Sequence, residues 1–315
     1  MQRILTSILM ASVISLAHAQ SYPTKTVRFV SGVTPGAASD TMARLLAERL
    51  SPILGQPVIV ENRLGAGGLV GAKYVAQQAE PDGHTIMMYA SAFTVSTLLN
   101  PGLDPKELVP VATVATIPTV MVTPPGKFKS IGDFVIAAKA QAGKLVCSDA
   151  GVGSATHMAF ERFRFAAGFE AINVHTKGPA EALTEVIAGR ADCYFALIFQ
   201  AAKLRDAGKV SALVVSSPRR SSLMPDLPTT VEAGFADSDY NFWVGALASA
   251  KTPRPIVERL NKEIGALVKS AELSDQIRKL GAEPLSLSIA EFDAMIQREL
   301  AENAQIIKKA GIKPN

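Results

Sequence analysis

Short apolar runs alternate with amphipathic stretches along most of the chain. The apolar runs at residues 27–31 and 58–60 predict two buried strands. Six apolar residues between them fall on one stripe of a 3.6-residue period and predict a helix that opens near Thr41: Met42, Leu45, Leu46, Leu50, Ile53 and Leu54. This alternation of strand and helix is typical of an α/β fold with parallel strands.

A second series of the same kind begins at residue 144. It predicts strands at 144–147, 172–175, 192–197 and 210–215, separated by helices after His157 and at 180–188. Before it, a Pro-rich connection leads into residues 111–122, which Pro118 breaks into two strands. We therefore expect two doubly wound lobes that face each other across a cleft, with a chain crossing near Pro118.

The lobe boundaries follow from that crossing and from the C-terminal pattern. We expect residues 20–116 and 244–315 to form lobe 1 and residues 117–243 to form lobe 2. The tail shows helical periodicity and a capping box from Ser288 to Glu291, and we expect its helices to pack on the first lobe.

Each half contains a turn of small residues between a strand and a helix. The first is Gly32-Val33-Thr34-Pro35-Gly36-Ala37-Ala38-Ser39-Asp40, and the second runs from Ser148 through Gly151, Gly153, Ser154, Ala155 and Thr156 to His157. The unpaired N–H groups and the positive dipole end of a helix form a seat for a carboxylate or phosphate. The alternative is a capped turn that binds nothing, with Ser39 or Asp40 as N-cap in the first turn and Ser148, Ser154 or Thr156 capping in the second.

A third strand end carries further candidates. The strand predicted at 85–89 ends in a polar loop with Ser91 and Phe93, and Phe195 lies near the end of the strand at 192–197. These two aromatic rings are either core or the apolar wall of a pocket, with core as the default. Arg63 could hold a carboxylate, although a surface ion pair is the expected role.

The N-terminus indicates export. Arg3, the apolar run at 4–16 and the sequence Ala17-His18-Ala19 form a secretory signal at residues 1–19, so we expect a periplasmic protein released by cleavage. Without residues 1–19 the charge is 31 minus 28, or +3, with no dense Lys/Arg run, and 6% of residues are aromatic. This composition argues against nucleic-acid binding. We expect no cofactor, because the glycines at 65–71 depart from the dinucleotide fingerprint at Val70.

Two questions remain open at the level of residue chemistry. Cys147 and Cys193 lie in predicted neighbouring strands, and because a bridge between parallel strands needs unusual geometry, the sequence favours two buried thiols; it offers no metal-site spacing. Ser154 and His157 could form a nucleophile–base pair of a secreted serine hydrolase, but the surrounding residues do not match the nucleophile elbow and no acidic partner is evident. We therefore expect no enzymatic activity.

The order of short motifs resembles the Bug-type receptors, which are the extracytoplasmic solute-binding proteins of tripartite tricarboxylate transporters. The similarity covers essentially the whole mature chain. It is carried by Thr34-Pro35-Gly36-Ala37-Ala38-Ser39-Asp40, Leu54-Gly55-Gln56-Pro57, Val60-Glu61-Asn62-Arg63, Pro81-Asp82-Gly83, Gly151-Val152-Gly153-Ser154, Pro225-Asp226-Leu227-Pro228-Thr229 and Ala310-Gly311-Ile312-Lys313.

The resemblance implies a Venus-flytrap fold of the periplasmic-binding-protein type II class and a carboxylate ligand bound by backbone amides of the two turns. It implies lobe closure, delivery to the membrane permease subunits of a tripartite tricarboxylate-type transporter, and a monomer; a ligand-sensing role without transport stays an alternative. The chain departs from the family where His175-Thr176 replaces the usual Pro-Tyr. An aromatic carboxylate or a dicarboxylate is the expected ligand, with Thr176 added to the binding residues.

Overall fold

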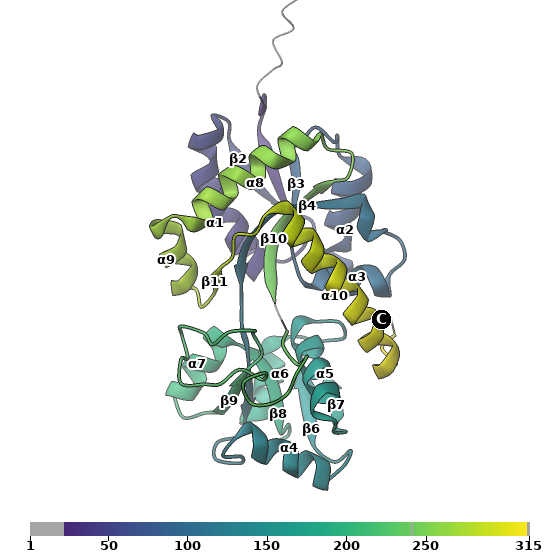
Figure 1. The fold of residues 1–315 in the computed structure, drawn as a ribbon, viewed down its shortest axis with the longest axis vertical. Coiled ribbons are helices and arrows are strands. Elements are labelled where there is room, and N and C mark those ends of the chain that lie inside the picture. The colour runs from purple at the N-terminus through teal and green to yellow at the C-terminus, as the bar shows by residue number, and fades with distance from the viewer. Residues whose placement is uncertain (1–21, 241, 314–315) are drawn as a thin grey trace, which may run out of the picture.

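Two α/β lobes are stacked along the long axis of the molecule in the computed structural model (Figure 1). The structure describes residues 22–240 and 242–313, so the signal expected at residues 1–19 lies outside the described residues. Among the described helices, none combines the length and the apolar character that a membrane crossing requires.

The first lobe is built on a six-stranded mixed sheet. In spatial order its strands are β11 (Glu283–Pro284), β4 (Leu108–Thr116), β10 (Trp243–Ser249), β3 (Thr85–Ala90), β1 (Val27–Ser31) and β2 (Val58–Asn62). Strands β1, β2 and β3 are parallel, whereas β10 runs antiparallel to both β3 and β4. One face is covered by α1 (Ala38–Leu54), α8 (Arg254–Lys269) and α9 (Ala271–Lys279), and the other by α2 (Leu69–Lys73), the π-helical turn Tyr74–Gln78, α3 (Ala92–Leu99) and the start of α10 (Ile289–Ala310). Two 3₁₀ turns, Ala66–Gly68 and Pro105–Glu107, complete this lobe.

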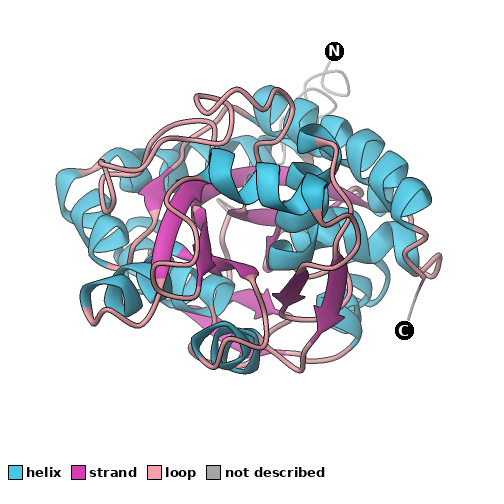
Figure 2. Cartoon of the chain, turned by 90° about the horizontal axis from the view of Figure 1, so that it is seen from below, coloured by secondary structure: helices cyan, strands magenta, loops and turns pink. Residues whose placement is uncertain are grey.

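The second lobe has a five-stranded sheet of related design. Its strands in spatial order are β7 (Ile172–His175), β6 (Val146–Asp149), β8 (Cys193–Leu197), β5 (Thr119–Thr123) and β9 (Ser211–Val215). Strands β6, β7 and β8 are parallel, and β5 is antiparallel to its neighbours. Helices α4 (Ile131–Ala140) and α5 (Ala155–Ala167) bury one face, while α6 (Pro179–Ile187) and α7 (Ile198–Asp206) bury the other. Seen from below, helices surround the strands (Figure 2).

In the described part of the chain, three segments connect the lobes. The crossing between β4 and β5 is hydrogen-bonded to the crossing between β9 and β10, since the Ile117 N–H donates to the Phe242 carbonyl at 2.8 Å. The third is α10, which descends from the first lobe along the second (Figure 1). Phe292 lies in the core of the first lobe, whereas Ile306 and Ile307 pack against that of the second. The expectation that the tail packs on the first lobe therefore fails for the second half of α10.

The lobes also touch away from these crossings. Gly281, after α9, lies so close to Phe199 of α7 that a Cβ atom added to the glycine would be 2.8 Å from the Cβ of Phe199. Beside it, the backbone N–H of Ser222 donates to Glu283 Oε1 at 3.1 Å. These contacts hold the two lobes together on one side of the molecule.

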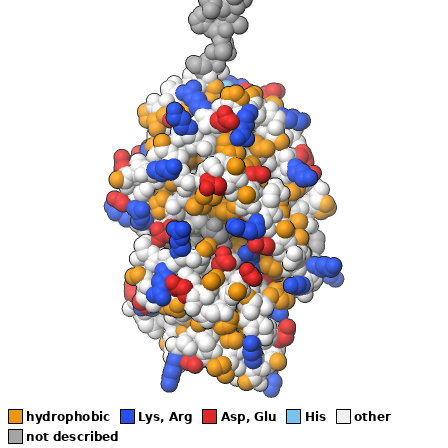
Figure 3. Space-filling model, viewed as in Figure 1, with side chains coloured by type: hydrophobic (Ala, Val, Ile, Leu, Met, Phe, Trp, Pro, Cys, Tyr) orange, Lys and Arg blue, Asp and Glu red, His pale blue; other side chains and the backbone are white. Residues whose placement is uncertain are grey.

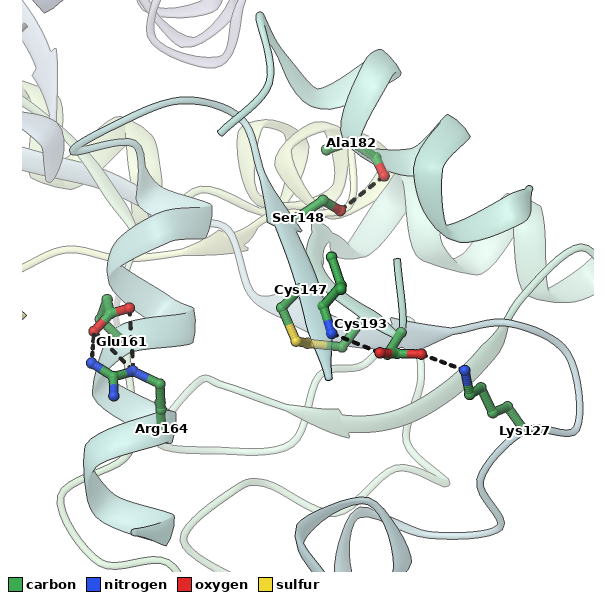
Figure 4. The surroundings of a disulfide bond; sticks show 9 residues. Lys127, Cys147, Ser148, Glu161, Arg164, Ala182 and Cys193 are labelled. Carbon is green, nitrogen blue, oxygen red and sulfur yellow. Dashed lines mark hydrogen bonds and ion pairs between the residues drawn. A yellow bond between two sulfur atoms is a disulfide. The ribbon is translucent and has the colours of Figure 1, made fainter. Parts of the chain in front are cut away.

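Three local predictions are corrected by the structure. Cys147 and Cys193 form a disulfide rather than two thiols, because register places them opposite each other on β6 and β8 with 4.6 Å between their Cα atoms (Figure 4). The segment predicted as a polar loop at 90–94 opens helix α3, since Phe93, Val95 and their neighbours bury one side of it. Strand β6 ends at Asp149, so Ser148 belongs to the strand and not to the turn.

Candidate functional site

The two predicted turns leave their sheets at edges that face the opposite lobe. Ser91, at the end of β3, has its Oγ 3.0 Å from the hydroxyl of Tyr240, which lies in the crossing between β9 and β10. Leu197, at the end of β8, packs against the core of the first lobe. Because β1 is parallel to β3 and β6 to β8, the turns after β1 and β6 open toward the junction of the lobes. A Cβ atom on Gly153 would meet Val95 of α3 at 3.1 Å, so the second turn approaches the first lobe closely.

The first turn presents an uncapped helix N-terminus. The N-cap of α1 is Ala37, which makes no side-chain capping bond, so the prediction of Ser39 or Asp40 as N-cap is wrong. Residues 34–36 are exposed, and 37 and 38 are half-buried. The first N–H groups of α1 have no acceptor within the helix and therefore remain available to an anion.

Asp40 is buried and shapes this turn. Its Oδ2 accepts hydrogen bonds from the Gly36 N–H at 2.8 Å and from Arg44 Nε at 2.9 Å, and its Oδ1 accepts from Asn62 at 2.8 Å. Burial acts to raise the pKa of Asp40, but the hydrogen bonds from Arg44, Gly36 and Asn62 outweigh it and hold that pKa below its usual range. Since its oxygens are engaged, Asp40 supports the loop and is not placed to contact a ligand.

The hydroxyls of the second turn bond within the protein. Ser154 is the N-cap of α5 and accepts from the His157 N–H at 3.2 Å, while Thr156 Oγ1 accepts from the Ala150 N–H at 3.0 Å. Ser148 is buried and donates to the Ala182 carbonyl at 3.0 Å (Figure 4). These bonds fix the loop. The N–H groups of Gly151, Gly153 and Ser154 also donate within it, so those of Val152 and Ala155 are the donors that the turn offers to a ligand.

A cluster of three side chains flanks this turn. Asp149 Oδ2 lies 2.8 Å from His175 Nδ1, and the rings of His157 and His175 meet edge to face at 4.8 Å between centroids. Residues of these types can ligate a metal, and ligand atoms of the three lie within 4.8 Å of one another. However, His157 Nδ1 accepts the Gly153 N–H at 3.0 Å, which puts the ring proton on Nε2 and leaves no free lone pair. Hydrogen bonding therefore accounts for the cluster. His175 and Asp149 were not among the site residues predicted from the sequence, although the replacement of Pro-Tyr by His175-Thr176 was a signal.

The geometry does not support the hydrolase alternative. Ser154 Oγ is bonded to the backbone N–H of His157 and not to its ring. Burial lowers the pKa of His157 to about 4, so the ring is neutral, but its Nδ1 lone pair is occupied by Gly153. Ser154 therefore lacks the hydrogen-bonded base that a nucleophilic serine requires.

The aromatic candidates lie in the cores. Phe93 and Phe195 are 1% and 0% exposed and pack in the first and second lobe, respectively, so the default assignment to core holds for both. Ser91 is also buried. Thr176 Oγ1 lies 2.7 Å from the Asp149 carbonyl and Arg63 pairs with Glu61 at 2.7 Å, so both side chains are held by neighbours.

Two surface cavities lie elsewhere. One of about 440 Å³ is lined by residues of β1, β3 and the π-helical turn, and one of about 840 Å³ lies between α5 and α10. Neither includes residues of the two turns. On the face shown in Figure 3, acidic and basic side chains are interspersed, so that face carries no block of one sign to attract a highly charged polymer.

Comparison with known proteins places this geometry in context. A family described as "Tripartite tricarboxylate transporter family receptor" matches residues 42–312. A protein encoded in the tcbD–tcbE intergenic region of Pseudomonas sp. strain P51 is 33% identical over 288 residues, which cover 89% of this chain and 85% of the relative. Among solved structures, R. palustris Rpa4515 with adipate is 30% identical with a TM-score of 0.79, covering 93% of this chain and 100% of that one. MatC from Rhodopseudomonas palustris with bound malate is 27% identical with a TM-score of 0.74, covering 91% and 100%.

Proposed function

The chain belongs to the family of tripartite tricarboxylate transporter receptors, and on that premise we propose that it captures a small carboxylate in the periplasm. Delivery of the ligand to the permease subunits of such a transporter completes the proposal. Solved relatives that hold adipate and malate support a carboxylate as the ligand class. We propose that the protein binds its ligand without transforming it and acts as a monomer.

The observation that carries the proposal is the uncapped N-terminus of α1 at an edge that faces the second lobe. The α1 turn and the α5 turn each present backbone N–H groups at the positive end of a helix dipole. A carboxylate between them accepts hydrogen bonds from both lobes and stabilises the closed form. We propose the turns at 34–38 and 151–155 as this seat, with the N–H groups of Ala38, Val152 and Ala155 as donors, because the neighbouring N–H groups of Gly36, Ala37, Gly151, Gly153 and Ser154 donate within the protein. The proposed lobes are 20–116 with 244–315, and 117–243, and α10 bridges them.

The first experiment measures ligand binding by the mature protein. Residues 20–315, freed of any bound ligand by unfolding and refolding, are screened by thermal shift against mono-, di- and tricarboxylates, both aliphatic and aromatic. A ligand at a hundred times its dissociation constant stabilises the folded state by about 3 kcal/mol, which is readily detected. If no carboxylate stabilises the protein, the proposed ligand class is wrong.

The second experiment tests the seat itself. Ala38→Pro and Ala155→Pro each remove one N–H group at the first helical position, where proline fits the helix. Because a hydrogen bond to a charged group contributes about 1.5–3 kcal/mol, each variant is expected to weaken binding at least tenfold. Ala271→Pro, at the same position of α9, is the matched control. Equal affinity in all three variants would place the ligand elsewhere.

A further inference from the structure

His175 stands at the same sheet edge as the second turn. It is the last residue of β7 and the register partner of Asp149, the last residue of β6. The Asp149 carboxylate contacts both the ring and the turn, because Oδ2 lies 2.8 Å from His175 Nδ1 and Oδ1 accepts the Gly151 N–H at 2.7 Å. One buried carboxylate therefore holds the histidine in a fixed position relative to the turn that carries the Val152 and Ala155 donors.

The contact also decides which ring nitrogen of His175 faces outward. A carboxylate oxygen is an acceptor, so Nδ1 of His175 carries a proton and Nε2 is left for another partner. The His175 side chain is 41% exposed, whereas that of Asp149 is fully buried. The Nε2 edge is thus the accessible part of the cluster, beside the proposed carboxylate seat.

The charges around His175 favour an anionic partner. A buried carboxylate is stabilised by a cation, and the His175 ring lies within ion-pair distance of the Asp149 carboxylate. When protonated, His175 donates from both nitrogens and presents positive charge at Nε2. The packed His157 is neutral because burial lowers its pKa to about 4. The chain nearby carries charges of both signs: Lys177 follows His175, its backbone N–H donates to the Glu181 carboxylate, and the charge of Arg164 on α5 acts on the packed His157.

We propose that His175 determines ligand specificity by binding a second carboxylate of the ligand through Nε2, with Asp149 as the positioning residue. The ligand class is therefore dicarboxylates, with one carboxylate on the helix amides and the other on the imidazole. This assignment rests on the proposed function and adds a side-chain contact to a seat otherwise made of backbone donors.

The test compares matched ligand pairs by calorimetry. Succinate is paired with butyrate and adipate with hexanoate, so that each pair differs in one carboxylate, and EDTA is present to exclude bound metal ions. At pH 6, the wild-type protein is expected to bind one of the two dicarboxylates at least tenfold more tightly than the monocarboxylate of the same pair.

Three variants distinguish recognition of the second carboxylate by His175 from a general effect of nearby positive charge. His175→Gln is expected to abolish the dicarboxylate preference while leaving monocarboxylate affinity within about twofold. His175→Lys retains a cation and is expected to restore part of the preference. Lys177→Gln removes the neighbouring exposed charge and is expected to leave the ratio unchanged.

The outcomes distinguish the two proposals. Wild-type binding with no dicarboxylate preference, or with a preference that His175→Gln leaves intact, would overturn the role of His175 alone. A wild-type protein that binds no carboxylate would remove the proposed function and this assignment together.

Discussion

Replacing Glu299 by Gln is expected to make the protein more stable at alkaline pH. Glu299 lies on α10, is 5% exposed and accepts a hydrogen bond from Trp243 Nε1 at 2.9 Å. Burial raises its pKa to about 8, while the Trp243 hydrogen bond and the charge of Arg162 act in the opposite direction. The side chain lies where α10 passes from the first lobe to the second, so its ionisation affects the stability of the connection between the lobes.

The direction and size of the pH effect on the free energy of unfolding follow from proton binding. Between pH 4.5, the ordinary pKa of this side chain, and about 8, the folded state holds a proton that the unfolded chain releases. The free energy of unfolding therefore falls as pH rises through this window. At about 1.4 kcal/mol per pH unit, the interval of about 3.5 units corresponds to about 5 kcal/mol, fully expressed above pH 8. Glutamine accepts the same Trp243 bond but carries no charge, so the variant escapes this loss.

The assay is urea unfolding at pH 5, 7 and 9, followed by circular dichroism and by the fluorescence of Trp243, the single tryptophan of the chain. Wild type and Glu299→Gln are expected to have similar stability at pH 5, and the variant is expected to exceed wild type by several kcal/mol at pH 9. Glu302→Gln, one turn away from the buried site, breaks an ion pair with Arg162 and is expected to lower stability. Parallel pH profiles for wild type and Glu299→Gln would refute the reasoning.

Three further predictions concern the second lobe and the contact between lobes. Reduction of the disulfide, which closes a loop of 46 residues, is expected to lower the free energy of unfolding by about 4 kcal/mol, measured by urea unfolding with and without dithiothreitol. In the wild type, the free energy of unfolding is expected to fall by about 3 kcal/mol as pH drops from 6.5 to 4, because the folded state keeps the His157 imidazole neutral in this window. His157→Gln is expected to remove this loss. A wild-type free energy of unfolding that stays constant over this window would contradict the prediction. Gly281→Val is expected to clash with Phe199 and enlarge the radius of gyration seen by X-ray scattering. Gly311→Ala, at a similar backbone angle in open space, is its control, and equal radii would exclude the clash.

Local sequence determined much of the secondary structure. The residue pattern predicted the strands at 27–31 and 172–175 with the bounds that the structure shows. The capping box at Ser288 and the capping serine of α5 behave as their side-chain chemistry dictates. These features depend on neighbouring residues alone, so periodicity and capping rules suffice to place them. The pair of small-residue turns at helix starts was also evident without a structure.

Only the tertiary structure decided which residues distant in the sequence contact one another. Strand β10 enters the centre of the first sheet from residue 243, and the second half of α10 packs on the second lobe, because each buries apolar surface that a far segment supplies. Register on β6 brought Cys147 opposite Cys193 and Asp149 opposite His175. A one-residue change of register turns a side chain to the other face of a sheet, and sequence periodicity does not specify which residue of another strand it will meet. The sequence alone determined where most strands and helices and the two small-residue turns form, and folding decided which side chains surround them.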